Sequence, residues 1–218
     1  MSLLELIARA DERALAASGV ACLDRCLPLP DEDGDPEPLR PLWAGSGTGF
    51  RWDERLAAVR EALDHEGAGE REPAIDGTAV RIRKALADAP STWTAGPLRE
   101  WADACSLLAL EIHLELDTPV RATGPDGGAV SDGPDDAAGS GAGAAGTALL
   151  ERCRAGATDG SGPLLAGELL RQIQILEALT ATSGTAAGGG GLRQVLDLST
   201  EGRRVLRAVM SRRARGRG

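Results

Sequence analysis

Apolar residues recur every three or four positions along most of this chain, which is the spacing of one face of an α-helix. The pattern is strongest over residues 95–117, whose apolar positions are Leu98, Trp101, Cys105, Leu108 and Ile112. We predict one long amphipathic helix there, with Pro97 in its first turn, where a missing N–H costs little. Its other faces carry Arg99, Asp103, Ser106 and His113. We expect His113 to be a solvated histidine near the helix end, with Asp117 one turn later as its available partner.

The same spacing predicts three shorter helices earlier in the chain, over residues 2–27, 52–67 and 77–89. Ser2 and Glu5 have the spacing of a capping box, in which each side chain binds a free backbone N–H of the first turn. If the first helix is interrupted, we expect the interruption at Gly19.

Residues 118–146 break the pattern, because they consist mainly of Gly, Ala, Pro and Asp and offer almost nothing to bury. Such a segment cannot offset the entropy lost on ordering, so we predict a flexible linker. Helical spacing returns over residues 147–211, with Thr147 as a cap and glycines 188–191 as a hinge before the last helix. Within that helix, residues 197–202 would either break it or restart it with Ser199 as a cap.

These patterns predict an all-α protein, since no run alternates apolar and polar residues as a half-buried strand would. Residues 1–117 should form a bundle of about four helices, followed by the linker 118–146. The helices of residues 147–211 are too few to bury their own apolar faces, so we expect them to pack on the bundle or on a second copy. Residues 212–218 are predicted to be a basic, disordered tail.

Charge and composition narrow the classes of function. The 218 residues carry a formal net charge of −9, which disfavours general nucleic-acid binding by the whole chain. Arg212, Arg213 and Arg215 are the exception, because such a tail can make weak, salt-sensitive contact with nucleic acid or an anionic surface. We see no signal peptide and no apolar run of membrane length. Four cysteines without a secretory signal then favour reduced thiols in the cytoplasm.

Two short motifs resemble known ligand sites but lack the context that those sites need. Residues 31–35 read like the start of a calcium loop, but Pro36 stands where the turn needs glycine and Leu42 where it needs a carboxylate. We interpret residues 27–43 as an acidic connector. Residues 141–146 spell G-x-G-x-x-G without the upstream strand that a dinucleotide site requires. We therefore expect no cofactor.

Cys22 and Cys26 are the most specific candidates for metal or redox chemistry. Four residues apart on a helix, they share a face and can both ligate one metal ion. A thiol or metal sensor would be favoured if their sulfurs faced Cys105, Cys153 or a histidine. Cys105 itself lies in the apolar stripe of its helix, where we expect core packing.

We conclude from the sequence that a non-enzymatic regulatory or adaptor protein, acting by contact with another protein or with itself, is the leading hypothesis. Trp43 and Trp93 are its candidate anchors, because aromatic side chains dominate many interfaces. Trp52 and Trp101 are expected in the core. The alternative is an enzyme or small-molecule-binding protein, favoured if buried polar residues such as Glu168, Gln172 and Arg99 converge on one cavity.

Overall fold

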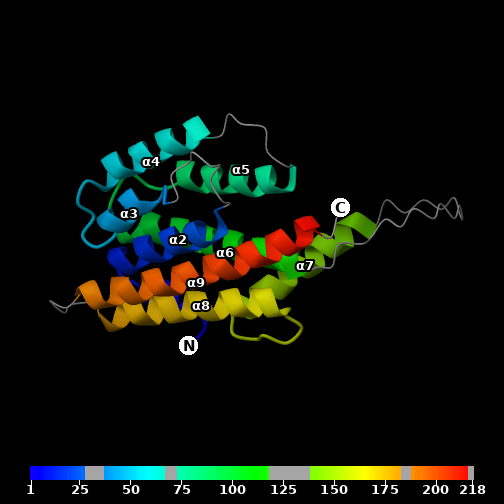
Figure 1. The fold of residues 1–218 in the computed structure, drawn as a ribbon. Coiled ribbons are helices and arrows are strands. Elements are labelled where there is room, and N and C mark those ends of the chain that lie inside the picture. The colour runs from blue at the N-terminus through cyan, green and yellow to red at the C-terminus, as the bar shows by residue number, and fades with distance from the viewer. Residues whose placement is uncertain (28–36, 67–72, 118–137, 183–187, 216–218) are drawn as a thin grey trace, which may run out of the picture.

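The computed structural model describes residues 1–27, 37–66, 73–117, 138–182 and 188–215, and in these ranges the chain forms nine α-helices and no strands (Figure 1). The predicted all-α class is therefore confirmed. The helices are α1 (Leu3–Arg9), α2 (Glu12–Cys26), α3 (Arg40–Gly45), α4 (Trp52–Glu66), α5 (Pro73–Ala87), α6 (Ala95–Asp117), α7 (Ala138–Arg154), α8 (Pro163–Ala181) and α9 (Gly188–Arg215).

Four helices, α2, α6, α8 and α9, pack against one another and bury most of the core. In Figure 1, α8 and α9 run side by side in opposite directions along one side of α2 and α6. The short helix α1 packs on α8 and α6, while α3, α4 and α5 cover the remaining side. Helices from both ends of the chain thus share one core, and this core holds the polar side chains described below.

The first predicted helix is broken, but not at Gly19. The capping box of Ser2 and Glu5 is confirmed, yet α1 ends at Arg9 and Asp11 starts α2 by accepting the Ala14 N–H at 2.8 Å. Gly19 lies inside α2, where a Cβ would come within 2.7 Å of the Trp101 ring. The glycine is needed for close approach of this ring to the helix backbone, so the predicted interruption there is wrong.

We expect Gly19→Ala to destabilise the protein by about 1–3 kcal/mol, because the added methyl group overpacks against a buried indole. Gly77→Ala is the matched control: Gly77 also lies inside a helix, but a Cβ there would meet nothing within 4 Å. That substitution should stabilise by about 0.5–1 kcal/mol through helix propensity. Urea unfolding of both variants measures the difference, and equal effects of the same sign would contradict this packing.

Part of the predicted linker is helical. Helix α7 begins at Ala138, so residues 138–146 are helical, while residues 118–137 lie outside the described part of the chain. Thr147 is not a cap, since its hydroxyl donates to the Gly143 carbonyl within α7 at 3.1 Å. The buried side chains of Leu150 and Cys153 anchor this helix, which allows the weak helix formers before them to extend it.

Glycines 188–191 open α9 instead of forming a hinge, and α9 continues without a break to Arg215. Gly191 packs against the end of α8, where a Cβ would lie 2.4 Å from Thr182 Oγ1. Ser199 is not a cap either, because its hydroxyl donates to Asp24 Oδ2 at 2.8 Å. Helix α3 was not predicted; it lies at the described end of the connector, whose residues 28–36, including the calcium-like motif, are outside the described residues.

Candidate functional site

Five polar side chains meet inside the bundle, and we call them the polar cluster. They come from three helices that lie far apart in sequence: Arg25 on α2, Ser106 and His113 on α6, and Glu168 and Gln172 on α8. All five are buried. Buried polar groups are stable only when they find partners, so the contacts within the cluster determine how these helices can pack.

Arg25 and Glu168 form the centre of the cluster. The Arg25 Nε donates to both carboxylate oxygens at 3.2 and 3.0 Å, and Nη2 donates to Oε1 at 2.5 Å. Both side chains are 0% exposed. Burial alone would raise the pKa of Glu168, but Arg25 and the neighbouring donors outweigh it and hold this pKa below its usual value. The pair therefore remains ionised in the core.

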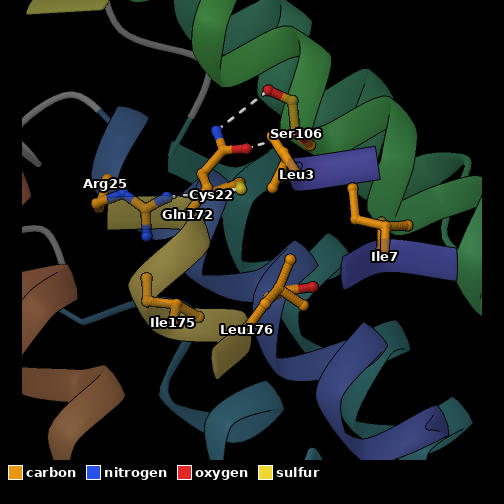
Figure 2. A pocket seen from close by; sticks show the side chains of 10 residues that line it. Leu3, Ile7, Cys22, Arg25, Ser106, Gln172, Ile175 and Leu176 are labelled. Atoms are coloured by element: carbon orange, nitrogen blue, oxygen red, sulfur yellow. Dashed lines mark hydrogen bonds between the residues drawn. The ribbon is translucent and has the colours of Figure 1, made fainter. Parts of the chain in front are cut away.

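Gln172 joins this ion pair to α6. Its Nε2 donates to Glu168 Oε1 at 2.9 Å, one helical turn away on α8. Its Oε1 accepts from the Ser106 hydroxyl at 2.6 Å, and Nε2 also lies 3.3 Å from the Ser106 carbonyl oxygen (Figure 2). Both the oxygen and the nitrogen of the Gln172 amide are thus hydrogen-bonded, and these bonds fix the register between α6 and α8.

His113 is buried, so the expectation of a solvated histidine is wrong. It is 1% exposed, with Nδ1 2.7 Å from the Ala109 carbonyl and Nε2 3.7 Å from Glu168 Oε2. A carbonyl only accepts, so Nδ1 carries the proton of the neutral ring. Burial lowers the pKa of His113 despite the opposing effect of Glu168. Asp117, the partner expected for it, instead accepts the N–H groups of Leu164 and Leu165 at the start of α8.

The lowered pKa of His113 predicts a pH dependence of stability. Between pH 6.5 and the lower pKa of the folded state, the unfolded chain binds the proton more tightly. The stability that the fold gains from keeping His113 neutral is therefore fully present above pH 6.5 and is lost as the pH falls below that value. We expect His113→Gln to reduce the dependence of the free energy of unfolding on pH between pH 6.5 and 5.5, measured by urea denaturation. An unchanged slope would show that His113 titrates normally.

The cavity beside the polar cluster is small. It lies between α1, α2, α6 and α8, and its volume of about 10 Å³ matches roughly one water molecule (Figure 2). Pockets for small molecules usually measure about 300–1,000 Å³. Of the three residues that the pocket hypothesis named, Gln172 lines this cavity, whereas Glu168 and Arg99 do not. The arrangement thus favours a structural role for the cluster over a ligand pocket.

Cys22 and Cys26 lie in the core next to the polar cluster. Arg25 Nη2 approaches Cys22 Sγ at 3.6 Å, and both cysteines are free and buried. Burial raises the pKa of Cys22 to about 12 and that of Cys26 well above its usual value. Since the thiolate is the form that binds metal, this environment opposes ligation. Among the described residues no three Cys, His, Asp or Glu side chains are grouped to hold a metal, so the Cys22/Cys26 site stays a prediction.

The aromatic residues of the chain occupy the α3–α6 region. Trp52 and Trp101 are core residues, as predicted, and each indole N–H donates at 2.8 Å to a backbone carbonyl, of Pro90 and Ala85 respectively. The Trp52 ring lies edge-on to both neighbours, 5.3 Å from Trp93 and 6.0 Å from Trp101 between centroids. One aromatic cluster therefore supports this part of the bundle.

Three aromatic side chains at its edge remain partly or largely exposed, and we call Trp43, Phe50 and Trp93 the aromatic end. Trp43 lies in α3 and is half-buried, as is Trp93 between α5 and α6. Phe50 is 65% exposed. The sequence interpretation overlooked it, although the only phenylalanine of the chain, placed between a glycine-rich turn and Trp52, was a usable signal.

The backbone around Phe50 explains its outward position. Gly49 has φ +70°, and a Cβ there would come within 2.4 Å of the Trp93 ring, so the loop lies directly on this indole. Arg51 adopts φ 54°, which is unusual for a residue with a side chain. The Phe50 N–H donates to Thr48 Oγ1 at 3.3 Å. Strained backbone of this kind clusters at functional sites.

The basic residues at the end of the chain differ from one another in exposure. Arg212 and Arg215 are exposed, and Arg215 donates to the Ser211 hydroxyl at 3.0 Å within α9. Arg213 is half-buried and donates to the Leu116 carbonyl at 2.5 Å, which ties α9 to the end of α6. Contact of these arginines with nucleic acid or an anionic surface stays a prediction.

None of the helices in the described ranges combines the length and the apolar character needed to cross a membrane. Comparison with protein-family models, with curated proteins and with solved structures found no match to this chain.

Proposed function

We propose that this chain is a non-enzymatic regulatory or adaptor protein that acts by binding another protein through its aromatic end. The observation that carries the proposal is the 65% exposure of Phe50, which directly follows Gly49 at the Trp93 indole. The chain has only four tryptophans, one phenylalanine and no tyrosine, and its single phenylalanine is largely exposed, while Trp43 and Trp93 pack partly against the core. Aromatic side chains of this kind act as anchors that fill pockets on a partner.

The polar cluster supports the same proposal because its side chains serve to hold the fold together. Glu168 and Gln172 use their oxygens and nitrogens for contacts within the fold, which hold α2, α6 and α8 together. A rigid bundle is a suitable scaffold for presenting a binding surface on a loop. We place the protein in the cytoplasm, supported by four free cysteines, which suit a reducing compartment.

Substitution of Phe50 should separate binding from folding. Because its side chain is largely exposed, Phe50→Ser should change the free energy of unfolding by no more than about 0.5 kcal/mol. Loss of an interface anchor costs about 2 kcal/mol or more, so partner affinity should fall by roughly 30-fold. Leu170→Ser is the matched control, since Leu170 is an apolar residue of α8 with 54% exposure.

Native mass spectrometry of the protein isolated from its own cells tests this prediction. We expect the wild type and Leu170→Ser to carry the same partner of defined mass, and Phe50→Ser to lose it. A partner mass equal to that of the chain would identify self-association through the same surface. Equal retention by Phe50→Ser and the wild type would contradict the proposal, as would a wild-type chain without any partner.

A further inference from the structure

The C-terminal half of α9 concentrates positive charge in an otherwise acidic chain. Residues 202–215 contain six arginines and no acidic residue, although the chain has 33 acidic and only 24 basic residues. Several basic side chains elsewhere on the described surface pair with carboxylates: Arg51 with Glu54, Arg81 with Glu111 and Glu115, and Lys84 with Asp88. Carboxylates are therefore plentiful in this chain, and the end of α9 is an exception among its elements.

Three of these arginines lie on one outward side of α9. Arg204, Arg207 and Arg215 are spaced by three and then eight residues, which places them on the same side of a helix. Ser211 lies one turn from both Arg207 and Arg215, and its hydroxyl accepts a hydrogen bond from Arg215 Nη1 at 3.0 Å. Arg207 is half-buried, and the other three side chains are exposed. We call these four residues the arginine face.

The positive charge of the arginine face is largely unbalanced within the fold. Arg204 has Glu201 at 3.9 Å, whereas no described carboxylate lies within ion-pair distance of Arg207 or Arg215. Burial and the neighbouring charge of Arg203 both lower the pKa of Arg207, which shows that its surroundings disfavour a cation. A negatively charged ligand on this face would relieve that repulsion and accept charge-assisted hydrogen bonds from the guanidinium groups.

The lack of exposed apolar residues at this end of α9 distinguishes between classes of partner. Among the described residues, the exposed large apolar side chain nearest in sequence is Leu196, two turns before Arg204. Protein interfaces usually centre on apolar and aromatic anchors, and helices that lie on membranes insert apolar side chains. Interfaces with nucleic acid are more polar and more positively charged, and arginine and serine side chains contact phosphates there. The arginine face thus fits phosphates best.

The aromatic residues favour a duplex over a single strand, because single strands bind by stacking their bases on aromatic side chains. The turn that carries Phe50 lies at the start of α9, since a Cβ on Gly47 would lie 3.6 Å from Leu192 Cδ1. The arginine face occupies the other end of this helix (Figure 1). With 28 residues, α9 is about 42 Å long, so the two surfaces are well separated.

We propose that the arginine face binds the phosphate backbone of double-stranded nucleic acid without reading its base sequence. Arg204, Arg207 and Arg215 donate to phosphate oxygens. The net charge of −9 opposes this contact only weakly, because salt screens charges that lie more than about 10 Å apart. The inference is independent of the aromatic end, and a chain with both surfaces would hold a protein partner beside a nucleic acid.

Fluorescence anisotropy of a labelled DNA duplex, titrated with the full chain, tests the proposal. Three phosphate contacts predict a slope of about −2.7 for the logarithm of affinity against the logarithm of salt concentration, which is a loss of about 40-fold between 50 and 200 mM salt. An RNA duplex of the same sequence should give a similar slope, since the contacts are to phosphates.

Two triple variants with the same change in net charge separate the arginine face from general electrostatics. Arg204→Gln/Arg207→Gln/Arg215→Gln should lower affinity for the duplex by about 10-fold or more at 50 mM salt and remove most of the salt dependence. The control substitutes three exposed arginines elsewhere, Arg9→Gln/Arg40→Gln/Arg193→Gln, and should retain most of the affinity. Circular dichroism checks that both variants are folded. Arg215→Gln alone changes only an exposed side chain and should reduce the slope by about 0.9.

Four results would overturn the proposal. The first is a wild-type chain that does not bind the duplex at 50 mM salt, and the second is equal affinity of the two triple variants. The third is tighter binding of a polyglutamate peptide than of the duplex, which would identify an acidic protein surface as the partner. The fourth is tighter binding of phosphatidylserine vesicles, which would identify an anionic membrane.

Discussion

Glu168→Gln is expected to destabilise this protein by about 3–5 kcal/mol, although the two side chains have nearly the same shape. The substitution removes the negative charge and leaves the guanidinium of Arg25 buried without a counter-ion, which is the costly situation for a core ion pair. Both groups are 0% exposed and lie within 2.5 Å of each other, so little solvent screens them. Arg25→Met should cost a similar amount because it leaves the carboxylate unpaired.

The double variant Arg25→Met/Glu168→Leu separates the pair from its individual groups. Replacing a whole buried ion pair by apolar side chains is often neutral, so the double variant should be more stable than either single variant. Urea denaturation of the wild type, Arg25→Met, Glu168→Leu and the double variant completes the cycle. Glu54→Gln is the matched control, because Arg51 and Glu54 form an exposed pair, and it should cost less than about 1 kcal/mol. Strictly additive single effects would contradict the coupling.

Trp52→Ala should also cost about 3–5 kcal/mol, since it removes a large, 1% exposed side chain from the core. Trp52 packs against Trp93 and Trp101 in T-shaped arrangements and donates to the Pro90 carbonyl. We therefore expect a second effect: Trp93 loses its support, and the aromatic end loses partner affinity even under conditions where the variant is folded. Thermal unfolding and partner binding measure the two effects.

Trp52→Phe is the informative companion to this variant. It retains most of the buried ring and loses the hydrogen bond to Pro90, so it should cost less than half as much as Trp52→Ala. Equal losses in the two variants would show that the hydrogen bond, and not the packed ring, supports this region. A Trp52→Ala variant that stays as stable as the wild type would contradict the packing described for α4.

The helices could be predicted from the sequence because each one buries a single stripe of apolar residues. The stripe of α6 through Leu98, Trp101 and Cys105 is an example, and all three are buried. The break before α2 was also readable, because Asp11 is a strong N-cap residue. The sequence instead favours a break at Gly19, since a glycine inside a helix usually weakens it, and nothing in the neighbouring sequence reveals that Trp101 packs against this glycine.

The polar cluster could not be assembled from the sequence, because its contacts depend on how distant helices pack. Arg25 and Glu168 are 143 residues apart, and neither has a neighbour in sequence that reveals the other. His113 was misread for the same reason: its local carboxylates indicated a solvated residue, whereas packing of α8 buries it. Exposure of Phe50 likewise follows from the backbone conformation of Gly49 and Arg51, which the sequence does not specify.

Site-specific photo-crosslinking tests the proposed binding surface most directly. A photoreactive amino acid at position 50, introduced into the full chain in its own cells, should yield one adduct of defined mass. The same amino acid at position 170, an exposed apolar site of α8, should yield none. Matching adducts at both positions, or no adduct at position 50, would contradict the account that the aromatic end is where this protein binds its partner.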